Sequence, residues 1–166
     1  MQTTDRNTEE TINQAKGELN RAKDRLAKDL TTTPDDKLNW SPSSTARTPI
    51  QLVAHSAMSI SGMQSWFSGT PFKWASIEEA DKEWREMEKA YTTRKEVADL
   101  LEENTANYCK WLDSLTAEKL ASDFTTPFGI FPMAMAITFV ADHLRNHAGQ
   151  LEYVQTIYGD LDWHMG

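Results

Sequence analysis

Apolar residues recur at steps of three and four along most of the chain, which is the spacing of one helical face. In residues 8–30 the apolar positions form a single stripe, and charged residues cover the opposite face. The stripe consists of Ile12, Ala15, Leu19, Ala22, Leu26 and Leu30. Residues 31–44 contain two prolines and many short polar side chains, so they predict a loop. Trp40 lies in this loop, and we expect it to anchor the loop to the core.

The clearest start of a helix is the segment Thr48-Pro49-Ile50-Gln51. Thr48 suits the N-cap, proline suits the first turn, and Gln51 stands where a capping box needs its second side chain. This second helix is predicted to continue to Phe67 and to end at the Ser-Gly-Thr-Pro segment that follows.

Residues 77–115 continue the helical spacing without a proline or glycine, so they predict one long third helix. Arg94 and Thr105 interrupt its apolar stripe, which indicates a bend or a polar contact inside the protein. A fourth helix is predicted over residues 132–158, with Gly159 as its C-terminal stop.

No segment shows the two-residue alternation of a strand, so none is expected. Four long helices predict an all-α protein, a four-helix bundle of the antiparallel type with long crossover loops, formed by a single domain over residues 1–166. The predicted connections have about 8 to 17 residues, and those after the first and third helices are long for a bundle and suggest crossovers. Long loops often carry function.

The net charge of the chain limits the kinds of partner that it can bind. Seventeen basic and twenty-five acidic residues give a net charge of −8, which argues against a nucleic-acid partner because phosphate binding needs a basic face. A hydrophobic content of 39% is sufficient for a core. The single Cys109 excludes an internal disulfide and a cysteine-rich zinc ribbon, and suits a reducing compartment.

The chain lacks the apolar run of about 20 residues that crosses a bilayer. Its first ten residues are polar and lack the apolar centre of a signal peptide. We therefore expect a cytoplasmic protein without a membrane partner.

Three histidines are placed where a metal site could form. His143 and His147 are four residues apart on the inward stripe of the fourth helix, and His55 lies on or beside the inward stripe of the second. Three neutral imidazoles can hold a divalent ion and leave a position open, as catalytic sites do. The alternative is that they are hydrogen-bonded core histidines, since the pair lacks the glutamate of a His-Glu-x-x-His motif.

Three segments resemble the DinB/YfiT-like superfamily. Residues 143–150 read His-Leu-Arg-Asn-His-Ala-Gly-Gln, which resembles that family's last helix. The second helix, with the Asn-Trp-Ser-Pro segment at residues 39–42 before it, resembles the helix that bears the first ligand. The Thr-Pro-Phe-Gly turn at residues 126–129 is similar to the connection before the last helix. The resemblance covers about residues 38–160.

The resemblance implies a four-helix bundle in which His55, His143 and His147 hold a divalent metal ion, and it favours a homodimer. Imidazole suits zinc, nickel, iron and copper, and we expect zinc or nickel. Family members of known activity include metal-dependent thiol S-transferases, which use bacillithiol, mycothiol or glutathione, and a maleylpyruvate isomerase. We therefore expect an enzyme with a small-molecule substrate and a low-molecular-weight thiol as co-substrate.

Two other functions stay open at this point. Activation of water in place of a thiol would make the protein a hydrolase. A helical module without enzymatic activity, which binds or dimerises without a metal or meets a partner helix through its aromatic face, is the alternative to an enzyme.

Few further residues can be assigned to a site. No catalytic residue is predicted beyond the ligands. Gln150 is expected to border the site, Asp142 to point away from it, and His164 to lie in the tail without binding metal. Three tryptophans around the loop between the second and third helices are expected to wall a pocket or to form a dimer face. They are Trp66, Trp74 and Trp84.

Overall fold

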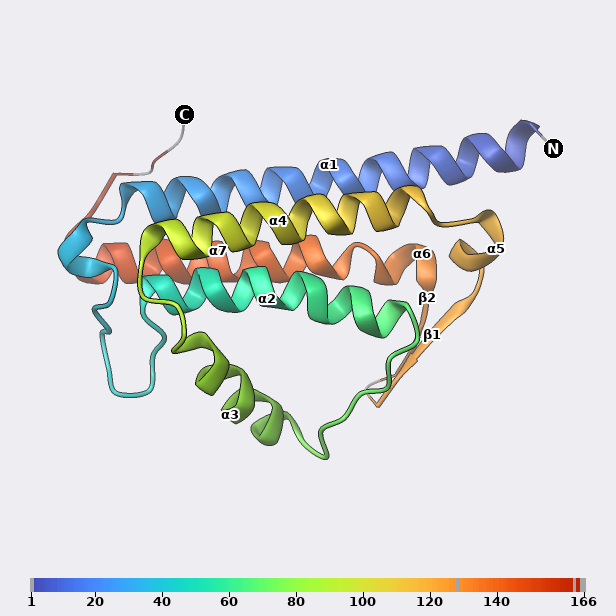
Figure 1. The fold of residues 1–166 in the computed structure, drawn as a ribbon. Coiled ribbons are helices and arrows are strands. Elements are labelled where there is room, and N and C mark those ends of the chain that lie inside the picture. Colours follow the sequence, from blue (N-terminus) through green and yellow to red (C-terminus); the bar gives the residue numbers. More distant parts are fainter. Residues whose placement is uncertain (1, 128, 163, 165–166) are drawn as a thin grey trace.

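Four long helices lie side by side in the computed structural model, which describes residues 2–127, 129–162 and 164 (Figure 1). They are α1 (Gln2–Thr32), α2 (Pro49–Phe67), α4 (Arg94–Asp113) and α7 (Phe139–Ile157). Helices α1 and α2 each pack on both α4 and α7, so the first two long helices of the chain lie diagonally across the bundle. The predicted four-helix bundle is confirmed.

The helix directions show which connection crosses the bundle. The connections after the first and third predicted helices were expected to cross, but they join α1 to α2 and α4 to α7, which run in opposite directions, so neither is a crossover. Helices α1 and α7 run one way along the bundle, and α2 and α4 run the other way (Figure 1). Neighbours that run parallel need a connection that returns along the bundle, because a short turn joins only antiparallel helices. The connection from α2 to α4 makes this return, and it carries the additional helix α3 (Ile77–Glu88).

Helices α1 and α2 follow the predicted patterns. All six residues of the α1 stripe are buried. At the start of α2, the Thr48 hydroxyl accepts a hydrogen bond from the Gln51 backbone, and the Gln51 side chain accepts one from the Thr48 backbone at 2.9 Å. The helix ends at Phe67 as expected. In the preceding loop, Trp40 packs edge-on against Tyr158 with ring centroids 6.0 Å apart, which confirms its predicted anchoring role.

The prediction of one helix over residues 77–115 is wrong. The chain leaves the helix after Glu88 and begins α4 at Arg94, with Thr93 and Glu96 forming a capping box. This start signal was overlooked because the apolar spacing continues through it. Arg94 makes the polar contact that its interruption of the stripe suggested, since its guanidinium donates to the backbone oxygens of Leu30 and Thr33.

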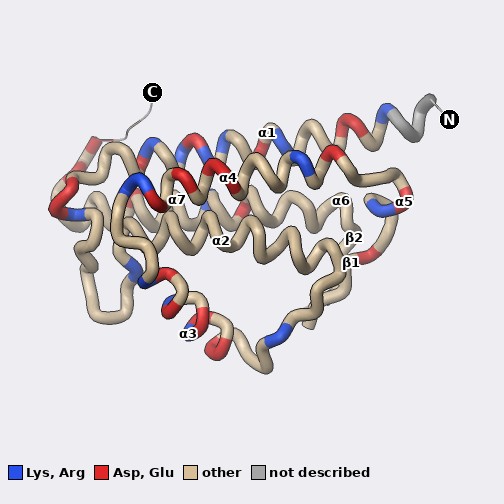
Figure 2. The backbone as a smooth tube through the Cα atoms, viewed as in Figure 1, with Lys and Arg blue, Asp and Glu red and all other residues tan. Residues whose placement is uncertain are grey.

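Helix α3 leaves the bundle and packs against the side of α2 (Figure 1). The sequence of α2 requires such a cover. Helix α2 contains no Lys, Arg, Asp or Glu, whereas α1, α3 and α4 carry many (Figure 2). A helix without a charged face is stable in water only when most of its surface is covered, and α3 supplies cover on the side that the bundle leaves open.

The expectation that no strand forms is also wrong. Strands β1 (Asp123–Thr126) and β2 (Gly129–Pro132) form an antiparallel hairpin in which Phe124 lies opposite Phe131. Each strand alternates in burial, but four residues are too few for that alternation to be recognised in the sequence. Residue 128 of the predicted Thr-Pro-Phe-Gly turn lies outside the described residues.

Three short helices complete the described chain. They are η1 (Asp35–Lys37), α5 (Ala117–Leu120) and α6 (Met133–Ala136). The fourth predicted helix is therefore interrupted, since the short α6 precedes α7. None of the described helices is long and apolar enough to cross a membrane.

Asp29 is an unusual part of the core near the end of α1. Its side chain is buried, and its Oδ2 atom has no hydrogen-bond partner among the described residues. Burial raises the pKa of Asp29 to about 7, and the nearby Glu152 carboxylate adds to this effect. The charged form therefore destabilises the folded state above pH 7, and this cost falls progressively as pH drops from 7 towards the ordinary pKa of 3.8.

We expect Asp29→Asn to raise the free energy of unfolding by about 2 kcal/mol at pH 8, because it removes this charge, and by much less at pH 5, where the native carboxyl is protonated. Urea unfolding at the two pH values measures the effect. Asp24→Asn, at an exposed position of the same helix, is the control. A gain that is equal at both pH values would contradict the explanation.

Candidate metal centre

The three histidines singled out in the sequence meet between α2 and α7. One ring nitrogen from each of His55, His143 and His147 lies within 4.8 Å of the other two. The Nε2 atoms of His143 and His147 are 3.1 Å apart, because residues four apart lie one above the other on a helix. The His55 ring reaches them from α2, with ring centroids 5.1 Å from His143 and 4.7 Å from His147.

The protonation of the two α7 histidines suits a cation. Burial lowers the pKa of His143 to about 3, and the neighbouring histidines add to the effect. Burial likewise lowers the pKa of His147 to about 4, helped by His55. Both rings are therefore neutral at pH 7 and keep a free lone pair, which a metal ligand needs.

The spacing of the nitrogens also suits an ion. Nitrogen ligands about 2.0 to 2.1 Å from a tetrahedral ion are about 3.4 Å from one another. The His143–His147 pair, at 3.1 Å, is already near this separation. The ring nitrogens of the three histidines lie within 4.8 Å of one another, which is at most about 1.4 Å more than the separation of ligands around such an ion. A small movement of the His55 side chain is enough to close this difference. Three imidazole nitrogens are a donor set for a divalent ion such as zinc or nickel.

Gln150 orients the His147 ring. The Nδ1 atom of His147 lies 2.8 Å from the Gln150 side-chain oxygen, one turn further along α7. An amide oxygen only accepts hydrogen bonds, so Nδ1 carries the hydrogen and the lone pair of Nε2 faces the cluster. Gln150 therefore borders the candidate site, as its spacing predicted.

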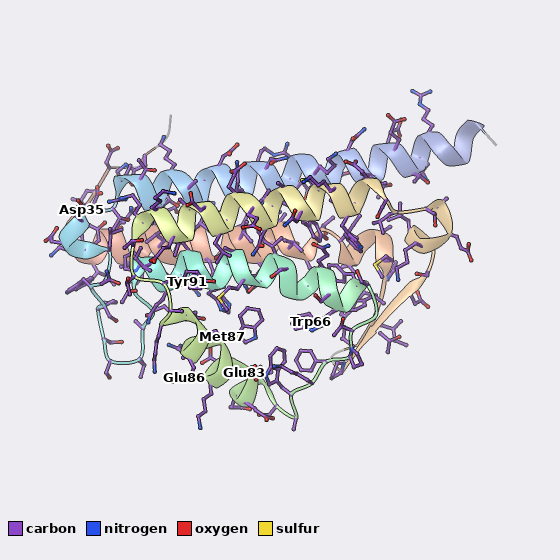
Figure 3. All side chains as sticks on the ribbon, in the orientation of Figure 1. Asp35, Trp66, Glu83, Glu86, Met87 and Tyr91 are labelled. Carbon is purple, nitrogen blue, oxygen red and sulfur yellow. The ribbon has the colours of Figure 1, made fainter. Side chains whose placement is uncertain are left out.

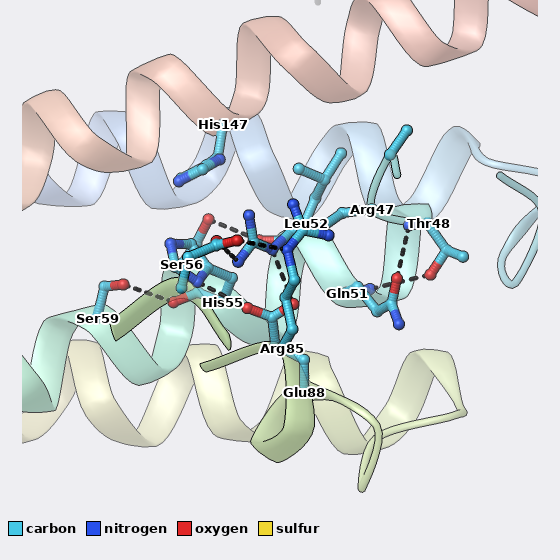
Figure 4. A network of polar contacts seen from close by, with 12 residues as sticks. Arg47, Thr48, Gln51, Leu52, His55, Ser56, Ser59, Arg85, Glu88 and His147 are labelled. Atoms are coloured by element: carbon cyan, nitrogen blue, oxygen red, sulfur yellow. Dashed lines mark hydrogen bonds and ion pairs between the residues drawn. The ribbon is translucent and has the colours of Figure 1, made fainter. Parts of the chain in front are cut away.

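Glu88, at the end of α3, orients the His55 ring. Its Oε1 atom accepts a hydrogen bond from His55 Nδ1 at 2.8 Å, which leaves Nε2 for the cluster (Figure 4). Its Oε2 atom accepts from Arg47 Nε at 2.7 Å, and Arg47 also pairs with Asp81 at 2.8 Å. Glu88 cannot be recognised in the sequence, because it is one acid among twenty-five and lies 33 residues from its histidine, with no spacing that marks it.

The Glu88 side chain is 0% exposed. Burial by itself would raise the pKa of this carboxyl, but hydrogen bonds from His55 and Arg47 outweigh it and hold the pKa below the ordinary value. Glu88 is therefore ionised at neutral pH and acts only as an acceptor. Such a carboxylate–histidine pair holds the ring and raises the basicity of its other nitrogen.

Trp84, one turn before Glu88 on α3, also packs against His55, with the two ring centroids 5.4 Å apart. It lies so close to α2 that a Cβ atom at Gly62 would be 3.0 Å from the indole. The ring centroids of Trp84 and Trp74 are 6.1 Å apart, and those of Trp74 and Trp66 are 6.0 Å apart. The three tryptophans therefore form one cluster, as their positions along the chain suggested.

The remaining candidates lie away from the cluster. Asp142 pairs with Arg145 at 2.6 Å on the exposed side of α7. His164 contacts Asp160 at 2.9 Å, and it is not among the histidines that meet at the candidate centre. Cys109 is half-buried, and burial raises the pKa of its thiol, so it has no feature of a reactive cysteine.

A four-helix bundle with three histidines directed inward from its second and last long helices is a scaffold suited to a divalent ion. A family model described as the DinB superfamily matches residues 18–151. The chain belongs to the DinB superfamily, which confirms the resemblance seen in the sequence.

Solved structures agree on the fold. Bacillus subtilis YfiT, described as a probable metal-dependent hydrolase with an unusual four-helix bundle topology, is 19% identical over 89% of this chain and 87% of its own, with a TM-score of 0.68. An uncharacterised protein from Clostridium difficile 630 is 14% identical over 88% of this chain and 96% of its own, with a TM-score of 0.74. These low identities establish a common fold and no more.

A mycothiol-dependent maleylpyruvate isomerase shares the fold at 14% identity over 84% of this chain, with a TM-score of 0.66. The match covers 60% of the isomerase, so that enzyme has a large part with no counterpart in the match. A comparison with curated proteins found no match.

The histidine pKa values predict how acid acts on the metal-free protein. Because the pKa values of His143 and His147 lie below their ordinary 6.5, the unfolded chain takes up protons first as pH falls. Their contribution to stability is therefore lost as pH falls from about 6.5 to about 4 for His147 and to about 3 for His143. Nitrogen NMR of the imidazoles at pH 5 should show both rings neutral. Titration of either ring near pH 6.5 would contradict the burial argument.

We expect Glu88→Gln to weaken zinc binding by about tenfold or more, because a neutral amide holds His55 less firmly and lowers its basicity. Competition with a chelating dye measures the affinity, and circular dichroism checks the fold. Glu86→Gln, at an exposed position of the same helix, should bind zinc like the native protein. Equal affinity in all three proteins would show that Glu88 does not support the site.

Proposed function

We propose that this protein is a divalent-metal-dependent enzyme that transfers a small thiol to an electrophilic small molecule. The observation that carries the proposal is the convergence of His55, His143 and His147 on a common point between α2 and α7. A divalent ion bound there would lower the pKa of a thiol or a water molecule that occupied an open position.

The chain's own residues contribute geometry and charge. The α7 histidines are neutral at pH 7, so they bind an ion without cancelling its positive charge. Gln150 and Glu88 hold the tautomers that direct ring nitrogens to the centre. Burial of His147, which is 8% exposed, limits access of water to its side of the site.

Transfer of a thiol is favoured over hydrolysis because the described part of the site has no free group to carry a proton. A bound thiol would give a thiolate and bound water a hydroxide, and each is a nucleophile as soon as it is formed. Hydrolysis of an ester or amide commonly needs a further group that carries a proton to the leaving group. Within the described chain, the candidate ligand group contains histidines alone, and the nearby Glu88 carboxylate is committed to His55 and Arg47. The mycothiol-dependent isomerase with the same fold supports the choice of a thiol, and the description of YfiT supports the alternative of hydrolysis.

A binding module without a metal is the second candidate. Its support is that His147 already has polar neighbours, Gln150 on one ring nitrogen and His143 on the other. In this case the histidines would be satisfied core residues and the protein would retain no ion. Association into a homodimer stays a prediction under both candidates, and sedimentation would measure it.

Metal analysis of the untagged protein separates the two candidates. We expect about one divalent ion per chain in the native protein and almost none in the His143→Ala His147→Ala variant. His164→Ala, which removes a histidine outside the cluster, should retain the ion. Equal metal content in the native protein and the double variant would contradict the proposal.

Turnover then distinguishes the two reactions. Metal-loaded protein should accelerate the reaction of monobromobimane with bacillithiol, mycothiol or glutathione, and the double variant should not. Release of nitrophenol from nitrophenyl acetate in the absence of thiol would instead indicate a hydrolase.

A further inference from the structure

A cavity of about 540 Å³ lies at the end of α2 that faces the hairpin. It is open to solvent on one side and is lined by the last turns of α2, the loop after it, the β1–β2 hairpin and the start of α7. Six aromatic rings form much of its wall, namely Trp66, Phe67, Phe72, Phe124, Phe131 and Phe139. Its volume falls in the range of about 300 to 1,000 Å³ that is typical of small-molecule sites.

The wall chemistry selects a neutral aromatic guest. Phe67 meets Phe124 edge to face at 4.9 Å, and Phe131 meets Phe139 edge to face at 5.2 Å. Rings arranged in this way present both edges and faces, which is the arrangement that a further aromatic ring prefers. The charged residues of the wall are Lys119 and Asp123, whose opposite charges leave no net attraction for an ion.

The cavity lies beside the histidine cluster along the same two helices. Phe139, in its wall, precedes His143 by one turn of α7, or about 6 Å along the axis. Met63, also in its wall, follows His55 by about 12 Å along α2. The distance between the cavity wall and the cluster along the helices is therefore within the length of a small molecule.

The tryptophan cluster connects the two places on the α3 side of α2. Trp84 contacts His55, Trp74 contacts Trp84, and Trp66 borders both Trp74 and the cavity. Figure 3 shows Trp66 on the side of α2 that faces α3. The Trp74 indole donates a hydrogen bond to Glu83 at 2.7 Å, so its polar atom is already satisfied and its ring offers an apolar surface.

From this juxtaposition we infer that the cavity binds a neutral aromatic group of the substrate while the electrophilic atom of the same molecule lies at the histidine cluster. The identity of the guest as substrate rests on the proposed function. Binding of an aromatic group in the cavity is independent of the proposed function, because none of the residues that line the cavity is a candidate metal ligand.

The first experiment titrates metal-free protein with 2-naphthol and follows saturation-transfer NMR. We expect saturable binding that Phe72→Ala and Phe131→Ala each weaken at least about fivefold, since each removes a ring from the wall. Ile130→Ala, at a hairpin position 66% exposed and outside the wall, should leave binding unchanged. Naphthalene-2-sulfonate should bind more weakly than 2-naphthol.

Three results of this titration would overturn the inference. They are the absence of saturable binding by the native protein, equal affinity in the wall variants and the Ile130 control, and sulfonate binding as tight as that of the neutral probe. None of them bears on whether the histidines hold a metal, which the metal analysis decides separately.

The second experiment locates the probe relative to the cluster. Protein loaded with Co²⁺ should broaden the NMR lines of bound 2-naphthol, and Zn²⁺-loaded protein should not, because a paramagnetic ion relaxes only nearby protons. Broadening that is absent despite full Co²⁺ loading would place the guest too far from the cluster and overturn its role as part of the substrate. A protein that takes up no metal would overturn the proposed function, and the naphthol titration alone would then decide whether the cavity binds aromatic groups.

Discussion

A fully buried carboxylate is the constraint on which the candidate site depends. Removing the Glu88 charge from water costs several kcal/mol unless partners compensate it. Arg47 and His55 do so, one on each carboxylate oxygen. These partners come from the segment before α2 and from α2 itself, whereas Glu88 ends α3. The ion pair and hydrogen bond of the Glu88 carboxylate therefore hold α3, α2 and the segment before α2 in fixed positions. They also fix the rotation of the His55 ring.

The break between α3 and α4 makes this arrangement possible. A continuous helix over residues 77–115 could not both pack in the bundle and return to cover α2. The capping box at Thr93 and Glu96 starts a new helix, and Arg94 bonds its first turn to the end of α1. Because α3 is separate from α4, it can cover the uncharged helix α2. The same break in the helix places Glu88 beside His55.

The electrostatics of the cluster favour a metal ion over protons. Burial keeps the two α7 imidazoles neutral, and protonation of one ring would repel its neighbours. The nearest strong cation, Arg47, is paired with both Glu88 and Asp81, which reduces its repulsion of an incoming ion. Neutral ligands beside a compensated charge are a setting in which an ion retains most of its own charge for chemistry.

Local patterns were sufficient for much of the fold. The spacing of apolar residues determined α1, α2 and α7, the capping residues determined where α2 begins, and the four-residue interval determined that His143 and His147 share a face with Gln150 within reach. These features depend on neighbours within one or two helical turns, so they can be predicted from short stretches of sequence. Convergence of His55 with that pair was an expectation that required the packing of α2 on α7.

Tertiary structure alone decided the rest. The partnership of Glu88 with His55 spans 33 residues and the cavity is assembled from α2, the hairpin and α7, so neither leaves a periodic signal. The hairpin is held by pairing between two strands of four residues, which is shorter than an alternation that can be recognised. Glu88 acts as a positioning group because it is buried, and a buried carboxylate is costly unless it is paired. Burial is a property of the folded chain and cannot be recognised from the residue type alone.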